Sequence, residues 1–179
     1  MSKDLKIGII LGSTREGRVS PFVGEWVKGL TESFGQASYE VVDVKSFNLP
    51  LLGESADMSG IMAWNEKLAS LDGFIFVVSE YNHSIAASLK NALDLARDPW
   101  ANKAAGIVSY GSVGGTRAAE HLRGILGELQ VADVRSHVTL SLFDDFTPEG
   151  FKPRAVHEAA VKDQVTQLEN WAKALKTIR

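Results

Sequence analysis

The sequence contains no cysteine among its 179 residues. This absence excludes disulfides, thiolate metal sites, cysteine nucleophiles and iron–sulfur clusters, so any redox chemistry must come from a bound cofactor. No apolar run reaches the length of a transmembrane helix, and the apolar segment near the N-terminus is too short for a signal peptide. We therefore expect a cytoplasmic protein with no membrane partner.

An excess of positive charge is also missing. Lys and Arg number 19 against 22 Asp and Glu, which gives a formal net charge of −3. Nucleic-acid-binding domains are usually basic, so we expect no nucleic-acid partner. The sequence also shows no clear Ser-His-Asp or paired-carboxylate pattern. We predict no metal site and no catalytic side chain.

What the sequence does contain is an alternation of short apolar segments with longer segments of helical period. The third apolar run, residues 73–79, is nearly continuous, which is typical of a strand buried on both faces. The pattern predicts strands at 5–11, 39–44, 73–79, 104–109 and about 134–140, and helices from Ser20, over about 62–70, over 84–96, after Gly115 and over about 154–177.

Strict alternation of this kind predicts a parallel sheet with helices on both faces. We expect one α/β domain over residues 1–179, a doubly wound five-stranded parallel sheet with the strand order 2-1-3-4-5. In such folds ligands bind outside the carboxyl ends of the strands, near the point where the strand order reverses. The loops after strands 1, 3 and 4 are therefore the places to search for a site.

The loop after strand 1, residues 12–20 (GSTREGRVS), holds three hydroxyls and two arginines and leads into a helix. Backbone amides at a helix N-terminus together with a guanidinium group are a common way of binding phosphate. The loop lacks the G-x-G-x-x-G pattern of dinucleotide-binding folds and the Gly-Lys-Ser/Thr of a P-loop. Its composition also fits an ordinary polar loop in which Ser20 caps the helix and proline follows at the first helical position.

The other two loops are also small and polar. In residues 79–84 (SEYNHS), Tyr81 could lie against an aromatic ring, and Asn82 tolerates unusual backbone angles. Residues 109–116 (SYGSVGGT) hold three glycines, which allow a flat ligand to approach the backbone. Either loop alone could be a simple turn, but three such loops at one sheet edge together predict a ligand site.

At these residues the sequence resembles the NADPH-dependent FMN reductase family, which includes flavodoxin-like quinone, azo-dye and chromate reductases. The matching segments are GSTR at 12–15 with Ser20, EYN at 80–82, LKNALD at 89–94, and the glycines of the loop after strand 4. The chain departs from the family at Ser79, where proline is usual, and at Ala86-Ala87, where Pro-Gly is common. Neither change is expected to abolish FMN binding.

The resemblance implies a flavodoxin-like fold that binds FMN non-covalently and uses NADPH or NADH as co-substrate. It implies an FMN-dependent NAD(P)H oxidoreductase with ping-pong hydride transfer, in which a small-molecule electron acceptor (a quinone, flavin, azo dye or metal oxyanion) takes the electrons second. Members of the family form oligomers, so we expect a homodimer or homotetramer.

The resemblance also assigns residues to the cofactor. Ser13, Arg15 and Ser20 would bind the phosphate, Tyr81, Asn82 and His83 would line the ring edge, and Ser109, Tyr110 and Gly111 would meet the pyrimidine side or close the pocket. Glu80 is less clear: it caps a helix, pairs across a subunit interface or is a solvated carboxylate. The complete set of predicted cofactor-binding residues is Ser13, Arg15, Val19, Ser20, Pro21, Phe22, Glu80, Tyr81, Asn82, His83, Ser109, Tyr110 and Gly111.

Two alternatives that are not enzymes fit much of the same pattern. A flavodoxin-type electron carrier shares the fold, but such carriers are usually far more acidic and their phosphate loop has no counterpart of Arg15. A flavin-binding regulatory protein would have the same sequence features. A receiver domain also shares the topology, but it needs an acidic cluster where this chain has Leu11-Gly12-Ser13.

Overall fold

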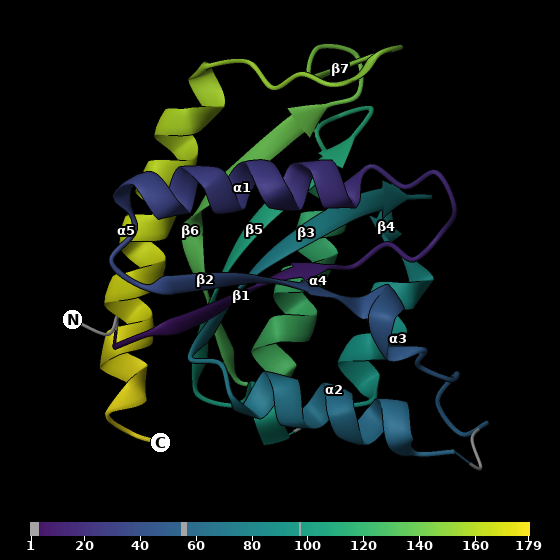
Figure 1. Cartoon of the computed structure of the whole chain (residues 1–179), viewed down its shortest axis with the longest axis vertical. Helices are drawn as coiled ribbons and strands as arrows, with labels where there is room; N and C mark the ends of the chain where they lie inside the picture. The colour runs from purple at the N-terminus through teal and green to yellow at the C-terminus, as the bar shows by residue number, and fades with distance from the viewer. Residues whose placement is uncertain (1–3, 55–56, 97) are drawn as a thin grey trace.

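The parallel sheet has the predicted strand order. A computed structural model describes residues 4–54, 57–96 and 98–179. Its main strands run in the order β2-β1-β3-β5-β6, all parallel, which is 2-1-3-4-5 in the numbering of the predicted strands (Figure 1). Their bounds are β1 Lys6–Leu11, β2 Ser38–Asp43, β3 Gly73–Tyr81, β5 Lys103–Gly111 and β6 Val131–Ser141. The doubly wound, flavodoxin-like α/β fold is therefore confirmed.

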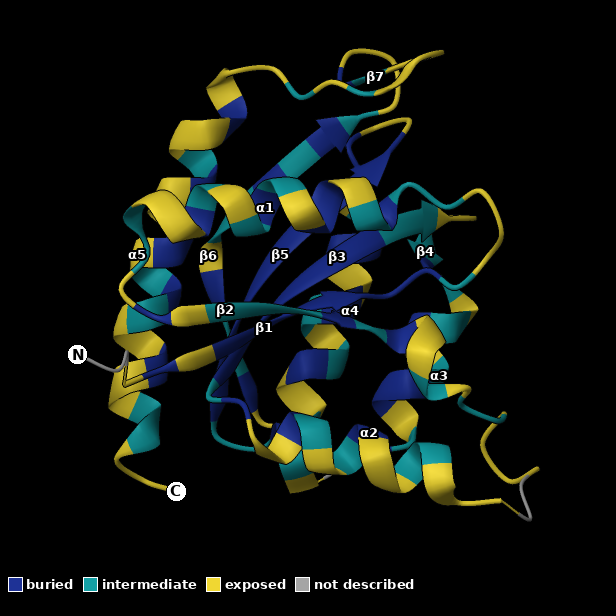
Figure 2. Ribbon diagram, in the orientation of Figure 1, coloured by how far each residue is buried: buried dark blue, intermediate teal, exposed yellow. Residues whose placement is uncertain are grey.

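Helices cover both faces of this sheet. Helices α1 (Ser20–Phe34) and α5 (Val156–Lys176) pack on one face and share one apolar cluster with it. Helices α2 (Ser59–Ala69), α3 (Ala87–Asp94) and α4 (Thr116–Glu128) share the cluster on the other face. Figure 2 shows the result: the central strands are buried, and the helices expose one side each.

The apolar composition of the central strands follows from this double cover. The first six residues of β3 and all nine of β5 are buried, because side chains on both faces of these strands meet helices. The edge strand β2 has a single fully buried residue, Val42. Short 3₁₀ turns, η1 (Val44–Phe47) and η2 (Asp98–Trp100), lie in the connections.

The segment after β3 differs from the prediction. Asn82 and His83 both adopt positive φ angles, 46° and 70°, and two successive residues of this kind form the type I′ turn of a tight hairpin. The chain reverses, and Ser84–Ile85 pairs back onto β3 as the short strand β4. Helix α3 therefore begins at Ala87, and the predicted start at residue 84 was wrong.

The pairing of β5 with β6 is interrupted by a bulge. The register shifts before Ile107, which pairs with His137, so that residues 134–136 of β6 form the irregular part. Gln164 of α5 fills this gap, because its Nε2 donates to the carbonyl oxygens of Ile107 at 2.7 Å and Ser136 at 2.8 Å. The irregularity shifts the register by two residues, so that His137 and not Arg135 lies opposite Ile107.

A small hairpin beyond β6 was not predicted. It consists of β7 (Phe146–Thr147) and β8 (Gly150–Phe151), strands too short to leave a periodic signal. Its two phenylalanine rings pack together with centroids 5.0 Å apart, and they reach Tyr110 of β5 at 6.0 Å and Trp26 of α1 at 5.7 Å. The hairpin therefore supports Tyr110 from the side.

Within the described ranges, no helix combines the length and the apolar character needed to cross a membrane.

Candidate functional site

Two of the three predicted loops line one cavity at the carboxyl edge of the sheet. Loop 12–20 is tied down by Gly12, whose N–H donates to the Val77 carbonyl at 3.3 Å and whose carbonyl accepts from Ser88 Oγ at 2.6 Å. A cavity of about 460 Å³ opens here. It is lined by Ser13, Thr14 and Arg15 of the first loop, Ser79, Tyr81 and Asn82 of the second, and residues 85–88.

The hydroxyl groups of Ser13, Ser20 and Ser79 gather around that of Tyr110, and Ser13 and Ser79 also line this cavity. Tyr110 is buried, and burial raises the pKa of its phenol, although the nearby hydroxyls of Ser79, Ser20 and Ser13 and the charge of Arg15 oppose the shift. Ser20 is fully buried; its hydroxyl lies near that of Tyr110, but its Oγ makes no hydrogen bond of normal geometry with any residue that the structure describes. An unpaired buried hydroxyl is costly, and a ligand oxygen at this position would satisfy it.

The two arginines of the loop have different roles. Arg18 makes a bidentate ion pair with Asp43 at the end of β2, with N–O distances of 2.6 and 2.5 Å, and also donates to the Ser13 carbonyl at 2.6 Å. It therefore braces the loop against the sheet. Arg15 is exposed, and its guanidinium donates to the backbone carbonyl of Glu16 at 3.1 Å. In the described part of the chain, no carboxylate pairs with Arg15, so its guanidinium is available to an anion.

The start of α1 also departs from the prediction. Val19, not Ser20, is the N-cap, and no side chain caps the helix. The Val19 carbonyl accepts from the amides of Phe22 at 3.1 Å and Val23 at 3.3 Å, and Pro21 has no amide to offer. Phe22 is largely exposed. Val19, Pro21 and Phe22 therefore form the first turn of α1, and Ser20 supplies the unpaired hydroxyl.

The predicted ring-edge residues divide into two groups. Tyr81, which is exposed, and Asn82 line the cavity. His83 turns toward α4 instead, where its Nε2 lies 2.7 Å from Nη1 of Arg117. Because a guanidinium only donates, His83 accepts through this nitrogen. The hairpin turn is therefore held from outside the cavity.

Glu80 caps helix α4, which is one of the roles left open above. Its carboxylate accepts from the amides of Arg117 at 3.2 Å and Ala118 at 3.4 Å and pairs with the Arg117 guanidinium. Burial raises the pKa of Glu80, but these hydrogen bonds outweigh it and hold the pKa below its usual value. The side chain is 5% exposed and its carboxylate turns to α4, so Glu80 is not among the residues that line the cavity.

Replacing Glu80 by alanine should lower the free energy of unfolding by about 2 kcal/mol, because helix α4 loses its cap and Arg117 loses its charged partner. Urea unfolding followed by tryptophan fluorescence measures the change. Glu120→Ala is the control, since this glutamate of α4 is 72% exposed and its loss should cost under about 0.5 kcal/mol. Equal effects of the two variants would contradict the capping role.

Ser109 supports the glycine loop from inside the protein. It is fully buried, and its Oγ donates to the Gly114 carbonyl at 2.6 Å and lies 2.7 Å from Nε2 of His137. A Cβ atom on Gly115 would lie only 2.8 Å from Ser109 Cβ, so the loop packs directly on β5. The Gly111 carbonyl accepts from the Gly114 amide at 3.1 Å. The Ser109 side chain thus contacts the loop and is not among the residues that line the cavity, and its predicted place at the pyrimidine side of FMN or in closing the pocket stays a prediction.

His137 is held neutral in this environment. Burial and then the charge of Arg123 lower its pKa to about 4, from an ordinary value of 6.5. Between these two pH values the unfolded chain binds a proton that the folded chain does not, so stability falls as the pH falls below 6.5. The neutral form is therefore the one that the fold selects at pH 7.

This shift predicts a measurable pH dependence. On going from pH 7 to about pH 5, the free energy of unfolding of the native chain should fall by about 1–2 kcal/mol more than that of His137→Gln, after allowance for partial exposure. Urea unfolding of both proteins at the two pH values provides the comparison. Parallel curves for the two proteins would show that His137 does not resist protonation.

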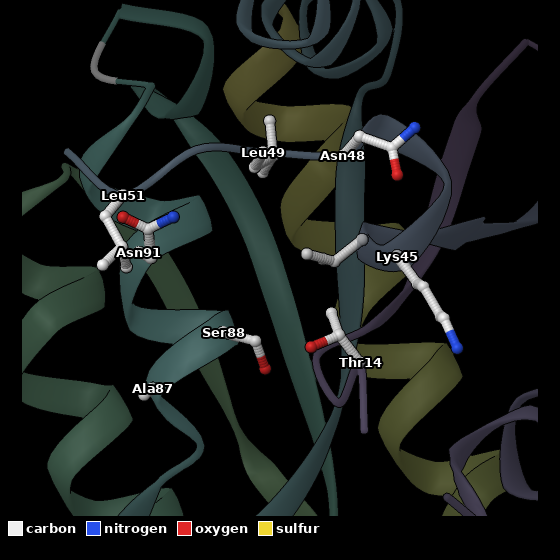
Figure 3. A pocket seen from close by; sticks show the side chains of 9 residues that line it. Thr14, Lys45, Asn48, Leu49, Leu51, Ala87, Ser88 and Asn91 are labelled. Atoms are coloured by element: carbon white, nitrogen blue, oxygen red, sulfur yellow. The ribbon is translucent and has the colours of Figure 1, made fainter. Parts of the chain in front are cut away.

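A second cavity of about 430 Å³ adjoins the first and shares Thr14, Ala87 and Ser88 with it. We call it the side lobe. Figure 3 shows Leu49, Leu51 and Asn91 around it, with the hydroxyls of Thr14 and Ser88 on one side and Lys45 at its margin. No carboxylate is among the described residues that line the side lobe.

Sequence reasoning missed three residues that build this site. Asn91 pins the segment before α2, since its Nδ2 donates to the Pro50 carbonyl at 2.8 Å and its Oδ1 accepts from the Leu52 amide at 3.0 Å. Asp43 fixes Arg18, and His137 supports Ser109. Asn91 lies in the matched LKNALD segment, which was a usable signal, but the other two pair across distant parts of the sequence and leave none.

Comparison with known proteins now decides the family. The family model of NADPH-dependent FMN reductases matches residues 5–145. The chain belongs to this family. It is 34% identical over 160 residues to an NAD(P)H-dependent FMN reductase of Schizosaccharomyces pombe, covering 84% of this chain and 80% of the relative. It is 32% identical over 137 residues to a 2-hydroxy-1,4-benzoquinone reductase of a Burkholderia species, covering 71% and 73%.

The fold of this reductase is shared with solved flavoenzymes. The NAD(P)H:(acceptor) oxidoreductase FerB of Paracoccus denitrificans superposes with a TM-score of 0.78 over 95% of this chain and 98% of that one, at 16% identity. At this identity the likeness shows the fold alone. Family membership makes the chain an FMN-dependent NAD(P)H oxidoreductase, as predicted.

The residues at the sheet edge fit FMN. The unpaired buried hydroxyl of Ser20 and the available guanidinium of Arg15 suit a phosphate. The open cavity beyond them is bordered by Tyr81 and Asn82, where a flat ring system could lie. These are observations about this chain's own side chains, and they agree with the family.

Proposed function

We propose that this reductase holds the FMN phosphate with Ser13, Arg15 and Ser20 and reduces a quinone as its acceptor. The observation that carries the first part is the buried, unpaired Ser20 hydroxyl at the end of the loop that also presents Arg15, so that this loop offers a donor and a positive charge to an anion. When bound, FMN supplies the two-electron redox chemistry between NAD(P)H and the acceptor. The protein supplies binding, orientation and electrostatics.

Tyr81 and Asn82 would border the ring, and the Gly111–Gly115 loop would close over it from β5. Tyr110 keeps its proton because burial raises its pKa, so its hydroxyl can donate within the cluster. Arg18 would act indirectly, because its hydrogen bonds to Asp43 and to the Ser13 carbonyl hold the phosphate loop in place. With these roles, no side chain is required as a general acid or base.

A quinone suits the side lobe for a chemical reason. Val44, Leu49 and Leu51 give it apolar walls that favour a planar ring, and the hydroxyls of Thr14 and Ser88 can face carbonyl oxygens. Relatives named 2-hydroxy-1,4-benzoquinone reductase and NADPH:quinone oxidoreductase support this class of acceptor. An acceptor screen should give a higher kcat/KM with a benzoquinone than with free FMN, an azo dye or chromate.

We further propose a single cytoplasmic domain that assembles as a homodimer or homotetramer. Two large apolar side chains at the side lobe are exposed in one chain, Leu51 and its neighbour Leu52, and burial between subunits would remove them from water. Light scattering at micromolar concentration tests the assembly. A monomer under those conditions would argue against it.

The experiment that tests the proposed function is a visible spectrum of the purified protein before and after anaerobic NADPH, followed by release and identification of the chromophore. FMN that NADPH bleaches would establish the cofactor and the reductive half of the reaction. FMN that stays oxidised would favour the electron-carrier or regulatory alternative. A colourless protein that cannot be loaded with FMN would overturn the assignment of the three loops.

A further inference from the structure

A series of hydrogen-bonded polar groups runs from His137 of β6 to the glycine loop. His137 Nε2 lies 2.7 Å from Ser109 Oγ, which lies 2.6 Å from the Gly114 carbonyl oxygen. A carbonyl oxygen only accepts, so the one hydroxyl proton of Ser109 goes to Gly114. Ser109 must then accept from His137, and the Nε2 of His137 must carry a proton. Each hydrogen bond in the chain therefore has one possible direction.

The position of His137 is a product of the β6 bulge. The register shift places His137 opposite Ile107, two residues before Ser109 on the neighbouring strand. From there its ring reaches Ser109 on the face of the sheet that α4 covers. The neutral imidazole is kept down to a pH of about 4, since burial and Arg123 lower its pKa. The donor is therefore present in a form that adds no charge near the site.

The final acceptor of these hydrogen bonds is the carbonyl of the Gly114–Gly115 peptide, which could rotate if nothing held it. Gly114 and Gly115 both have positive φ, 73° and 72°, and glycine moves among backbone conformations at little cost. In a trans peptide the C=O and the following N–H point in opposite directions. Fixing the Gly114 carbonyl toward Ser109 therefore turns the Gly115 N–H away from Ser109. Without the hydrogen bonds that link His137, Ser109 and Gly114, the Gly114–Gly115 peptide could rotate and reverse the directions of its C=O and N–H groups.

We propose that His137 is a positioning residue that, acting through Ser109, locks the Gly114–Gly115 peptide in the loop that closes the FMN site. The inference rests on the proposed placement of this loop beside FMN. His137 itself touches neither cofactor nor substrate in this arrangement. It would affect the cofactor by fixing the orientation of the Gly114–Gly115 peptide.

The test compares His137→Leu, His137→Gln, Ser109→Ala and the double variant His137→Leu/Ser109→Ala. The measurements are the Kd of FMN, the absorption spectrum of bound FMN, and amide hydrogen exchange of the loop in the FMN-free protein. Leucine removes the donor, whereas the side-chain amide of glutamine can replace it. We expect His137→Leu and Ser109→Ala each to weaken FMN binding about tenfold, to shift the spectrum and to speed exchange at Gly115. His137→Gln should stay close to the native protein in all three.

The double variant should be no worse than either single variant, because both substitutions break the same chain. Ser136→Ala is the matched control: this neighbouring residue of β6 hydrogen bonds to Asp163 and Gln167 of α5, on the opposite face, and should leave FMN binding unchanged.

A purely structural role for His137 would lower the melting temperature and leave FMN affinity, spectrum and loop exchange at native values, and this would overturn the proposal. Effects that multiply in the double variant, or failure of glutamine to restore the native behaviour, would also overturn it. If the native protein binds no FMN, the proposed function fails, while loop exchange in the FMN-free protein still decides the role of His137.

Discussion

Replacing Asp145 by asparagine should lower the free energy of unfolding by about 3 kcal/mol, the largest effect on stability that we expect from a single polar substitution here. For a chain of this length such a loss corresponds to a fall of about 10 °C in melting temperature. Urea unfolding at pH 7 and thermal unfolding followed by circular dichroism both measure it.

The reason is the number of donors that meet on one buried carboxylate. Asp145 is fully buried and accepts from the Ser141 amide at 2.8 Å, from the Arg154 amide and Nε at 3.1 and 3.0 Å, and from Nε2 of His157 at 2.8 Å. Burial raises the pKa of Asp145, but these hydrogen bonds outweigh it and lower the pKa to about 2. An asparagine would turn an NH₂ group toward donors that need an acceptor.

The same pKa predicts how this stability depends on pH. The folded pKa of about 2 lies below the ordinary value of 3.8, so the unfolded chain takes up the proton first as the solution is acidified. The stabilisation is therefore fully present above the unfolded pKa and is lost as the pH falls toward the folded one. The native protein and Asp145→Asn should become more alike in stability over that acid range.

A neighbouring residue provides the control. Asp144 is 56% exposed and lies 3.9 Å from the same Arg154 guanidinium, so Asp144→Asn should cost under about 0.5 kcal/mol. If the two asparagine variants proved equally stable, the donors around Asp145 would not be stabilising the loop. A large loss at Asp145 alone would show that the network joins the end of β6 to α5, next to the hairpin that supports Tyr110.

The fold could be predicted because buried strands and half-buried helices differ in the spacing of their apolar residues along the sequence. The run at 73–79 is nearly continuous in apolar residues because helices cover both faces of β3. The alternation with helical segments left few topologies, among which the doubly wound order was chosen. What escaped prediction depends on single backbone conformations. The turn at Asn82 and His83 needs positive φ at two residues that are not glycine, and nothing in the local pattern distinguishes it from a helix start.

The site could be predicted at the level of loops and only partly at the level of side chains. Composition placed Ser13, Arg15 and Ser20 together, and the structure brings them to the same edge. The Glu80 carboxylate has the capping role, one of the alternatives that the sequence left open, and the Ser109 hydroxyl contacts the glycine loop, because the partner of each lies on the segment that leads into α4. Those partners follow from tertiary packing, which motif spacing does not report.

Arg15→Ala should weaken FMN binding by about 1.5–3 kcal/mol, or roughly 10- to 100-fold in Kd, which is the range for a hydrogen bond to a charged group. The guanidinium is exposed and has no carboxylate partner among the described residues, so its removal should leave the fold intact. Arg15→Lys should recover part of the loss, because an ammonium keeps the charge without the bidentate geometry. Fluorescence titration of the FMN-free protein gives the Kd of each variant.

Riboflavin separates a phosphate contact from a general effect on the pocket, because it has the same ring system and no phosphate. Arg15→Ala should bind riboflavin as the native protein does, and its FMN affinity should depend less on salt, since an exposed ion contact is screened. Arg135→Ala removes another exposed arginine, on β6, and should change neither affinity. Equal losses for FMN and riboflavin would mean that Arg15 orders the loop without holding the phosphate, and the anion site would then have to rest on Ser20 and its neighbouring hydroxyls.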